Sequence, residues 1–297
     1  MSSGAKGRDA MYDGVGREKN KIEAGVLYLV ATPIGNLADL SERAIKVLSE
    51  VDFIAAEDTR NTAKLLTYLG ISKPMVSYHQ HNRTERGDVI CDRLKNGESC
   101  ALVTDAGTPA ISDPGEDLVR LCAERGIKVT FIPGACAAIA ALALSGMFTG
   151  RFAFEGFVSG AKGERRKRLD ELKNDERTLI FYEAPHHLTG TLNDFYNVFG
   201  DRRIALCREL TKLNEEIIRT TLSEAIEYYK TNSPRGEYVL ILEGGVKAAD
   251  DFWTGMTPVE HVEHYINSGM DKNTAIKAAA KDRGVPKNEI YKEFINK

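Results

Sequence analysis

The sequence predicts an α/β protein with two α/β domains, a parallel sheet in the first, a mixed sheet in the second, and a small C-terminal helical segment. Short apolar segments alternate with segments of helical periodicity along most of the chain, which is typical of sheets covered by helices. The 297 residues suffice for two domains with cores. A hydrophobic fraction of 42% and a charged fraction of 28% are ordinary for a globular protein.

The first domain is expected over residues 25–133, as alternating strands and helices. The predicted strands are Val26–Ala31, Phe53–Ala56, Met75–Tyr78, Cys100–Thr104 and Lys128–Ile132. Ser41 is a typical N-cap for the first helix, and later helices are predicted over Thr62–Leu69, Arg83–Lys95 and Gly115–Arg125. Strands joined by helices in this way form a parallel sheet.

The second domain is expected over residues 134–245. Its predicted strands are Phe152–Phe157, Thr178–Tyr182, Ile204–Arg208, Glu216–Thr221 and Glu237–Leu242. Its predicted helices are Gly163–Lys173, Pro185–Phe199 and Leu222–Lys230. Two consecutive strands around Leu206 and Ile218 indicate an antiparallel hairpin, so this sheet is expected to be mixed.

The two ends of the chain differ from these domains. Residues 1–24 are polar and glycine-rich and are interpreted as a disordered leader, native or added by cloning, because they lack the apolar core of a secretory signal. Residues 257–297 follow the Gly244–Gly255 stretch and are expected to be helical only. The predicted tail helices are Val259–Ile266, Lys272–Arg283 and Lys287–Asn296.

Composition narrows the classes of function. A net charge of −3 gives no global basic field, so any contact with RNA must come from a local patch. The longest apolar run, Ala135 to Leu144, is far shorter than the roughly 20 residues that span a bilayer. The five cysteines form no CxxC pair and indicate buried thiols in a reducing compartment, so a cytoplasmic location without a membrane is expected. The six histidines have no metal-ligand spacing, and no metal is predicted.

Unusual loops follow the five strands of the first domain. They read TPIGNLADLS, EDTRNT, YHQHN, TDAGTPAISDPG and PGACAA. Ligands of open α/β sheets bind outside the carboxyl ends of the strands, and glycine and proline permit close backbone approach there. Neither GxGxxG nor GxxxxGK[ST] is present, and the acidic residues of these loops suit a positively charged ligand. These acidic residues are Glu57, Asp58, Asp105 and Asp113.

Together these motifs resemble a known family. LYLVATPIGNLADLSERAIKVL, IAAEDTRNTAKLL, HQHN, LVTDAGTPAISDPG, IPGACAAIAAL, EGF, LIFYEAPHHL and CRELTKLNEEI are similar to the small-subunit ribosomal RNA 2′-O-methyltransferases of the tetrapyrrole methylase superfamily. The resemblance runs from about Gly25 to Gly244. It implies the superfamily's two-domain class III fold with S-adenosyl-L-methionine in the cleft, usually in a homodimer. It also implies 2′-O-ribose methylation of a cytidine in the decoding region of 16S rRNA, within the small ribosomal subunit.

The resemblance also implies which residues bind the cofactor. On matching positions these are Pro33, Ile34, Gly35, Asp105, Ala106, Gly107, Thr108, Ile111, Gly134, Ala135, Cys136, Tyr182 and Arg208. The alternative for the small residues after Gly134 is tight packing of a helix on a sheet. The chain departs from the family's pattern at His187, where arginine is frequent, and at Ala135, where proline is common.

Methyl transfer to a ribose hydroxyl requires loss of a proton, and a base within hydrogen-bond reach assists this loss. The candidates are Asp58, Glu209 and Lys212, of which Lys212 could also steady the developing alkoxide. The structural alternative is that Glu209 pairs with Arg208 and that Asp58 caps the helix from Thr59.

Two segments are candidates for RNA binding. The run KGERRKR places five basic residues among seven, at Lys162, Arg165, Arg166, Lys167 and Arg168. Lysine and arginine supply most of the sequence-independent affinity for RNA, although such a run is also typical of a solvated helix face. The C-terminal tail is similar to the helix-turn-helix tails of some family members, and its alternative is a packing or dimerisation appendage.

Two other functions remain open. One is methylation of a tetrapyrrole of the precorrin type on the same fold, which the basic run argues against because such a substrate needs no phosphate track. The other is a non-catalytic RNA-binding assembly factor, which the intact DAGTP loop argues against.

Overall fold

The computed structural model describes residues 21–245 and 252–295. The described parts of residues 1–166 and 178–243 form one compact unit, and those of 167–177 and 244–297 form a second. Most of the predicted leader lies outside the described residues. Of its described part, Ile22 packs against the buried apolar cluster that includes Tyr28 and Leu48, and the Glu23 N–H donates to the Tyr28 hydroxyl at 2.8 Å.

The first unit contains a five-stranded parallel sheet, as predicted. The strands lie in the order β3-β2-β4-β1-β5, and each neighbouring pair runs parallel. Their bounds are β1 Val26–Val30, β2 Phe53–Ala56, β3 Met75–Ser77, β4 Cys100–Val103 and β5 Lys128–Ile132. The carboxyl ends of these strands therefore meet at one edge, where the unusual loops begin.

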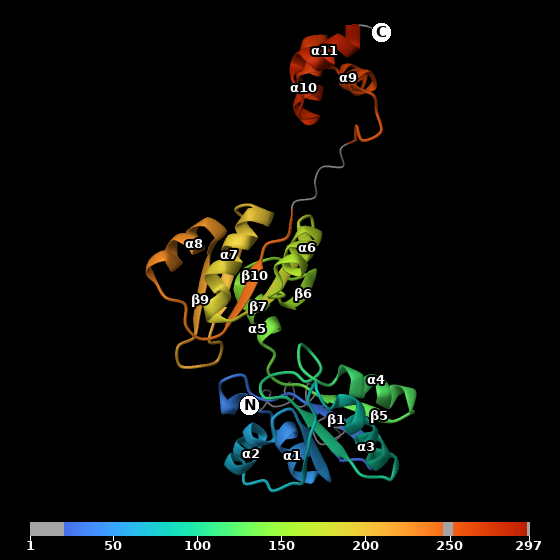
Figure 1. Ribbon diagram of the computed structural model, residues 1–297, viewed down its shortest axis with the longest axis vertical. Helices are drawn as coiled ribbons and strands as arrows, with labels where there is room; N and C mark the ends of the chain where they lie inside the picture. The colour runs from blue at the N-terminus through green and yellow to red at the C-terminus, as the bar shows by residue number, and fades with distance from the viewer. Residues whose placement is uncertain (1–20, 246–251, 296–297) are drawn as a thin grey trace, which may run out of the picture. The chain divides into compact units, whose positions relative to one another are not determined.

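Helices cover both faces of this sheet (Figure 1). Side chains alternate between the faces along a strand. Tyr28 therefore packs with the first two helices, whereas Leu27 packs with the third and fourth. The bounds are α1 Glu42–Glu50, α2 Thr59–Tyr68, α3 Arg83–Lys95 and α4 Glu116–Glu124. This arrangement is the doubly wound one that the alternating pattern predicted.

Local capping explains where α2 begins. The helix starts at Thr59, three residues before the predicted start at Thr62. Asp58 is its N-cap, and its carboxylate accepts a hydrogen bond of 2.8 Å from the Arg60 N–H. The Asp58 side chain is thereby occupied at the helix terminus.

The first unit also contains a five-stranded mixed sheet, again as predicted. Its order is β6-β7-β10-β8-β9, in which only β6 and β7 are parallel. Its strands are β6 Phe152–Phe157, β7 Thr178–Glu183, β8 Arg203–Arg208, β9 Glu216–Thr221 and β10 Tyr238–Leu242. The hairpin expected around Leu206 and Ile218 is confirmed, because these two residues are paired in the antiparallel β8–β9 ladder.

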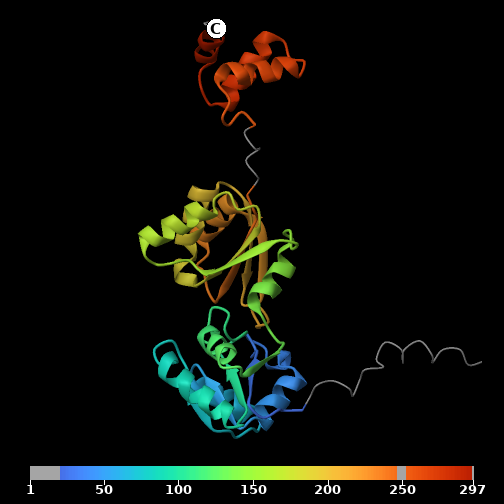
Figure 2. The ribbon, with the colours of Figure 1, turned by 90° about the vertical axis from the view of Figure 1, so that its right-hand side faces the viewer.

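The faces of the mixed sheet carry different helices (Figure 2). The alanine-rich α5, Ala137–Ser145, lies on one face and packs on Ile180, Ala205 and Ile241. The helices α7, Pro185–Phe199, and α8, Leu222–Thr231, lie on the other. The basic helix α6 covers Lys162–Leu172.

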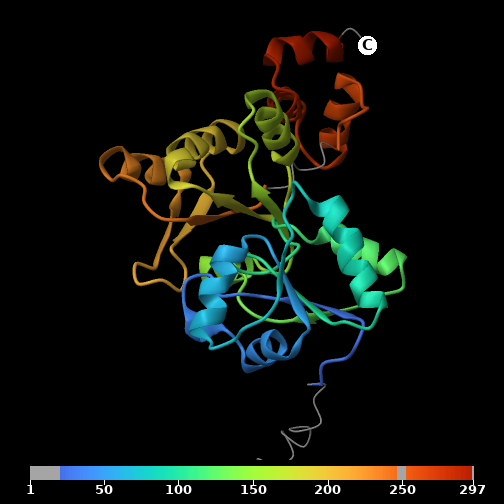
Figure 3. The ribbon, with the colours of Figure 1, turned by 60° about the horizontal axis from the view of Figure 1, so that its bottom comes forward.

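The second unit contains the three tail helices (Figure 3). They are α9 Pro258–Asn267, α10 Lys272–Asp282 and α11 Lys287–Ile295. Their apolar faces meet in a core that includes Val262, Ile276 and Ile290. The three predicted helices are thus present, although Asn296 lies outside the described residues.

Two expectations from composition bear on the described residues. Four free cysteines, Cys91, Cys100, Cys122 and Cys207, are buried as expected, while Cys136 is partly exposed. Across residues 21–245 and 252–295, none of the helices has the length and apolar character needed to cross a membrane.

Candidate active site

A cavity of about 520 Å³ lies in the first unit, within the range of about 300–1,000 Å³ typical of small-molecule sites. Part of its wall comes from loops of the parallel sheet and the start of α5: Ile34, Glu57, Asp105, Ala106, Gly107, Thr108, Ile111, Ser112, Asp113, Cys136 and Ala137. The rest comes from the mixed sheet and its loops: Phe157, Tyr182, Glu183, Ala184, Pro185, Cys207, Glu209, Leu210, Lys212, Glu237, Tyr238 and Val239. Four of the five unusual loops contribute, and YHQHN does not.

The first and fourth loops are joined by their backbones. The Thr32 N–H donates to the Gly107 carbonyl at 2.8 Å, and the Gly107 N–H donates to the Thr32 carbonyl at 3.1 Å. Gly107 has a φ of 88°, which favours glycine. Because its N–H is engaged by Thr32, Gly107 supports the loop and does not offer that donor to a ligand.

Backbone strain is concentrated in two loops of the cavity wall. Among the described residues, the non-glycine residues with positive φ are Ala110, Ser112, Glu209 and Thr211. Each such residue costs about 1–3 kcal/mol, and strain of this kind clusters at functional sites. The loops that hold Asp113 and Lys212 are therefore fixed in conformations that the chain would otherwise avoid.

One part of the wall carries three carboxyl groups from two loops, Glu57 after β2 and Asp105 and Asp113 between β4 and α4. Glu57 follows β2 and accepts a hydrogen bond of 2.8 Å from the Thr104 hydroxyl. Asp105 follows β4 and accepts one of 2.9 Å from the Asn61 amide. Burial, followed by the charge of Glu57, raises the pKa of Asp113 to about 6.

On the other side of the wall, Lys212 connects two carboxylates. Its ammonium donates to Glu209 at 2.8 Å and to Glu237 at 2.7 Å. Burial lowers the pKa of Lys212, but these hydrogen bonds outweigh burial, so its pKa is raised. The hydrogen bond from Lys212 lowers the pKa of Glu209, against the opposing effect of burial. The missing side chain of Gly35 makes room for Lys212, since a Cβ there would overlap the Lys212 stem.

Most predicted cofactor and catalytic residues are brought together here. The predicted residues in the wall are Ile34, Asp105, Ala106, Gly107, Thr108, Ile111, Cys136, Tyr182, Glu209 and Lys212. Those outside it are Pro33, Gly35, Asp58, Gly134, Ala135 and Arg208.

The residues outside the wall have other contacts. The Ala135 carbonyl accepts a hydrogen bond of 3.1 Å from the Thr108 hydroxyl. Gly134 packs so closely on Ala31 that a Cβ would lie 2.9 Å from the Ala31 Cβ. Arg208 forms an ion pair of 3.1 Å with Glu216. Asp58 caps α2, as the structural alternative had it.

The predicted RNA-binding residues lie on α6 but differ in exposure. Lys162, Arg166, Lys167 and Arg168 are exposed, and Arg168 also pairs with Glu171 at 3.0 Å. The side chain of Arg165 is only 16% exposed, and it bonds Asp194 at 2.6 Å and Thr191 at 2.8 Å. Arg165 therefore joins α6 to α7 and is poorly placed to meet a phosphate.

Sequence reasoning missed Phe157, Glu183 and Glu237 in the wall. The β6–β7 register shifts between Phe154 and Gly156, and Gly156 has a φ of 63°, as at bulges that redirect a side chain. The following residue, Phe157, is 63% exposed, and its ring lies edge-to-face with Tyr182, with 5.5 Å between ring centroids. The glycine in EGF was the one available signal for this bulge.

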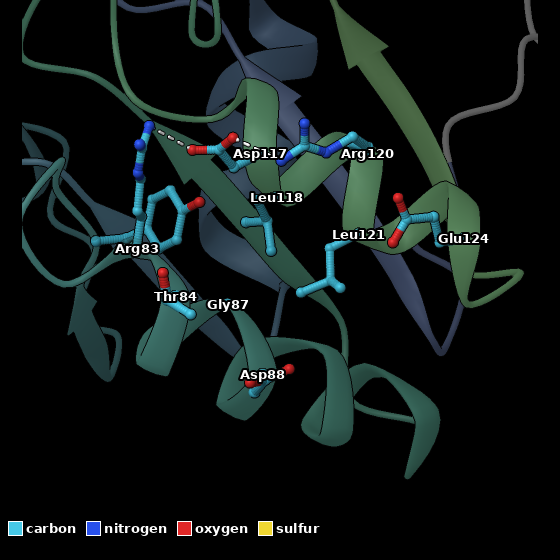
Figure 4. Close-up of a pocket in the computed structure, with 10 residues that line it drawn as sticks. Arg83, Thr84, Gly87, Asp88, Asp117, Leu118, Arg120, Leu121 and Glu124 are labelled. Atoms are coloured by element: carbon cyan, nitrogen blue, oxygen red, sulfur yellow. Dashed lines mark hydrogen bonds and ion pairs between the residues drawn. The ribbon is translucent and has the colours of Figure 1, made fainter.

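A second cavity, of about 410 Å³, lies between α3 and α4 (Figure 4). Two arginines of this cavity share one carboxylate, because Asp117 forms ion pairs of 2.7 Å with Arg83 and 3.0 Å with Arg120. Its charged groups thus compensate one another, and no residue predicted for cofactor, catalysis or RNA lines it. The first cavity is the candidate active site.

The two sheets, the loop-lined cavity and the order of the motifs define a class of protein. The family model of tetrapyrrole (corrin/porphyrin) methylases matches residues 26–226, more than half of the chain. The chain belongs to this family.

Closely similar relatives carry a more particular name. The chain is 50% identical over 272 residues to ribosomal RNA small subunit methyltransferase I of Halalkalibacterium halodurans, covering 91% of this chain and 94% of that protein. It is 48% identical over 278 residues to the protein of the same name from Bacillus subtilis, covering 92% and 95% of the two chains. The resemblance inferred from the sequence motifs is therefore confirmed.

Solved structures share the fold at low identity. Cobalt precorrin-4 methyltransferase has a TM-score of 0.54 and 18% identity, over 74% of this chain and 95% of that one. Uroporphyrin-III C-methyltransferase from Thermus thermophilus, in complex with S-adenosyl homocysteine, has a TM-score of 0.53 and 18% identity, over 72% and 96%. These likenesses confirm the predicted fold class.

Proposed function

We propose that this protein transfers a methyl group from S-adenosyl-L-methionine to the ribose 2′-oxygen of a cytidine in the decoding region of 16S rRNA. One observation carries the proposal. The chain is 50% identical to a ribosomal RNA small subunit methyltransferase I, and it has a cavity of small-molecule size at the loops predicted to bind the cofactor. The finer assignment, to a cytidine and its 2′-oxygen, rests on the motifs quoted above.

The cavity fits a zwitterionic sulfonium cofactor. Glu57, Asp105 and Asp113 supply negative charge for its sulfonium and ammonium groups. Helix α5 begins at the wall with Ala137, and its N-cap Cys136 makes no side-chain capping bond. A helix N-terminus attracts carboxylates, so the two signs of charge are separated within the cavity as such a ligand requires. When bound, S-adenosyl-L-methionine would supply the electrophilic methyl group.

The charges of the cavity also indicate where RNA binds. Its acidic wall repels phosphates, so the RNA backbone must be held elsewhere and one nucleoside inserted. The exposed cations of α6 supply a phosphate-binding surface, which begins five residues after Phe157. Exposed aromatic rings such as Phe157 stack on unpaired bases, at about 1–3 kcal/mol per base.

The alternative of a tetrapyrrole substrate is less well supported. Tetrapyrroles of this kind carry several carboxylates, which the acidic wall would repel. The solved tetrapyrrole enzymes share only the fold, at 17–18% identity. The cavity and its intact cofactor loop likewise disfavour a binding-only assembly factor.

We further propose that the protein acts in the cytoplasm as a homodimer. Apolar side chains that are exposed on the first unit are available for self-association. They include Phe131 on the edge strand β5, and Ile139 and Leu144 on α5.

The domain boundaries at residues 25–133 and 134–245, and the helix-turn-helix interpretation of residues 257–297, stay predictions.

Methylation of purified 30S particles tests the proposed function. With labelled S-adenosyl-L-methionine, we expect one methyl group per particle, located on a cytidine ribose by mass spectrometry of nuclease digests. A methyl group on a base, or methylation confined to tetrapyrroles, would contradict the proposal.

A further inference from the structure

The proposed reaction needs a group that accepts the ribose hydroxyl proton, and such a group must face the cavity. Asp58 does not, because it caps α2 and bonds Arg60. Lys212 and Glu209 do face it, but they bond each other at 2.8 Å. A protonated ammonium cannot accept a proton, and a carboxylate that binds an ammonium is a weakened base. None of the three candidates from the sequence is therefore suited to the task.

Asp113 differs from these candidates in position and surroundings. It lies in the cavity wall on the loop between β4 and α4. The left-handed backbone of Ala110 and Ser112 fixes the turn before it. The turn is also packed tightly, since a Cβ on Gly115 would lie 2.8 Å from Leu102 and one on Gly156 would lie 3.1 Å from the Ser112 hydroxyl. The Asp113 carboxyl is thus carried by a rigid segment at the cavity surface.

We propose that Asp113 is the catalytic base that takes the proton from the ribose 2′-hydroxyl. The inference rests on the proposed function. As the 2′-oxygen forms its bond to the methyl carbon, the carbon–sulfur bond breaks and its electron pair stays on sulfur. The hydroxyl proton passes to a carboxylate oxygen of Asp113 and is later released to water. No further reactant is required.

The groups that face Asp113 set its proton affinity. Its surroundings include the carboxyls of Glu57 and Asp105, the Thr104 hydroxyl and the Tyr182 phenol. Burial and Glu57 raise the pKa of Asp113 to about 6, so at neutral pH the group is mostly ionised and more basic than an ordinary aspartate. Burial also raises the pKa of Tyr182 to about 12, so this phenol stays neutral beside it. A base with a pKa near the working pH is the efficient one.

Asp113→Asn tests the inference. A general base contributes at least about 10²-fold, so kcat on 30S particles should fall by about that factor or more. The dissociation constant for 30S particles should change less than about threefold. That for S-adenosyl-L-methionine should rise, because a carboxyl beside the positively charged cofactor is lost, so kcat is measured at saturating S-adenosyl-L-methionine. The fall of kcat below pH 6 in the wild type should vanish in the variant. A ¹³C NMR titration of aspartate carboxyls should lose one resonance that titrates near pH 6.

Glu57→Gln separates a catalytic from a merely structural role. Removing this negative charge should lower the pKa of Asp113 and move the acid limb of the kcat profile to lower pH, while the reaction persists. Asp92→Asn is the matched control, because it replaces an exposed carboxyl on α3 outside the cavity. It should leave both kcat and the acid limb of the kcat profile unchanged.

The outcomes distinguish this inference from the proposed function. If the wild type methylates 30S particles and Asp113→Asn does so equally fast with the same acid limb, Asp113 is not the base. If the wild type methylates no 30S particle at any pH, the proposed function itself fails. A thermal melt of Asp113→Asn at or above the wild-type temperature excludes unfolding as the cause of a lost rate.

Discussion

At the scale of single residues, the ionisation of Asp113 couples stability to pH. The folded-state pKa of about 6 lies above the ordinary value of 3.8. Between these values the folded protein binds more protons than the unfolded chain, so the free energy of unfolding falls as pH rises from about 4 to 7.

Asp113→Asn should therefore be more stable than the wild type at neutral pH. We expect a gain of about 1–2 kcal/mol at pH 7.5, below what the full shift implies because the side chain is partly exposed. The gain should shrink towards zero as the pH approaches 4. Urea denaturation at several pH values measures it, and a loss of stability at pH 7.5 would contradict the assigned surroundings of Asp113.

Gly107 provides a second test at a single residue. Gly107→Ala places a side chain at a φ of 88°, with its Cβ 3.3 Å from Ile34. We expect a loss of about 1–2 kcal/mol in the free energy of unfolding and at least tenfold weaker binding of S-adenosyl-L-methionine by calorimetry.

The matched control for this test is Gly97→Ala. Gly97 has a φ of 92° and nothing within 4 Å of an added Cβ, so it reproduces the backbone strain away from the cavity. It should lose similar stability and keep cofactor affinity. Equal affinities of the two variants for S-adenosyl-L-methionine would show that Gly107 is not part of the cofactor site.

Residue roles were predictable where they follow from local chemistry. Asp58 as a cap was reachable in this way, whereas Ala106 and Thr108, which lie in the cavity wall, were expected from the family resemblance. The pairing of Lys212 with Glu237, 25 residues away, was not, because it depends on how β8 and β10 come together. The raised pKa of Asp113 was hidden for the same reason, since its burial and its proximity to Glu57, which follows β2, both depend on how the chain packs.

At the scale of elements, helix α6 combines a structural and an exposed face. Arg165 points to Asp194 and Thr191, while Lys162, Arg166 and Lys167 are exposed. The heptapeptide KGERRKR predicted a basic helix, but the inward pairing of one of its arginines depends on α7.

Reversing the three exposed charges should weaken RNA binding. We expect Lys162→Glu, Arg166→Glu and Lys167→Glu together to raise the dissociation constant for 30S particles and to flatten its dependence on salt. Each phosphate contact contributes roughly 0.7–0.9 to the steepness of log K against log salt, so the loss of three contacts should reduce the slope by about 2–3.

Filter binding at several salt concentrations measures this effect. Lys46→Glu, Lys95→Glu and Lys230→Glu together change the charge equally, at exposed positions on α1, α3 and α8. An equal loss of binding in this control would show that net charge, and not α6, governs association. Cofactor affinity should be unaffected in both proteins.

Most element bounds were predictable because apolar periodicity and glycine caps are local signals. The strand order β6-β7-β10-β8-β9 was not, because it is decided by long-range packing. The bulge at Gly156, and with it the direction of Phe157, likewise exists only through pairing with β7.

At the scale of the whole molecule, the proposed function combines a phosphate-binding surface on α6 with a cavity that admits one nucleoside. Changing the target ribose to 2′-deoxy in an otherwise competent 30S particle should therefore abolish methyl transfer. Binding should weaken less than about tenfold, because the phosphate contacts remain. Filter binding and incorporation of labelled methyl measure the two effects separately. Transfer to the deoxy substrate would assign the reaction to a different atom.

The three carboxyls of the cavity wall have a consequence for turnover. In the proposed reaction, transfer of the methyl group removes the positive charge from sulfur and the ribose proton passes to Asp113, while Glu57 and Asp105 keep their places. The spent cofactor thereby loses a Coulomb attraction, of about 4 kcal/mol for a single pair at 4 Å with an effective dielectric constant of 20 and less with water present. In this proposal the wall itself favours replacement of spent cofactor by fresh cofactor.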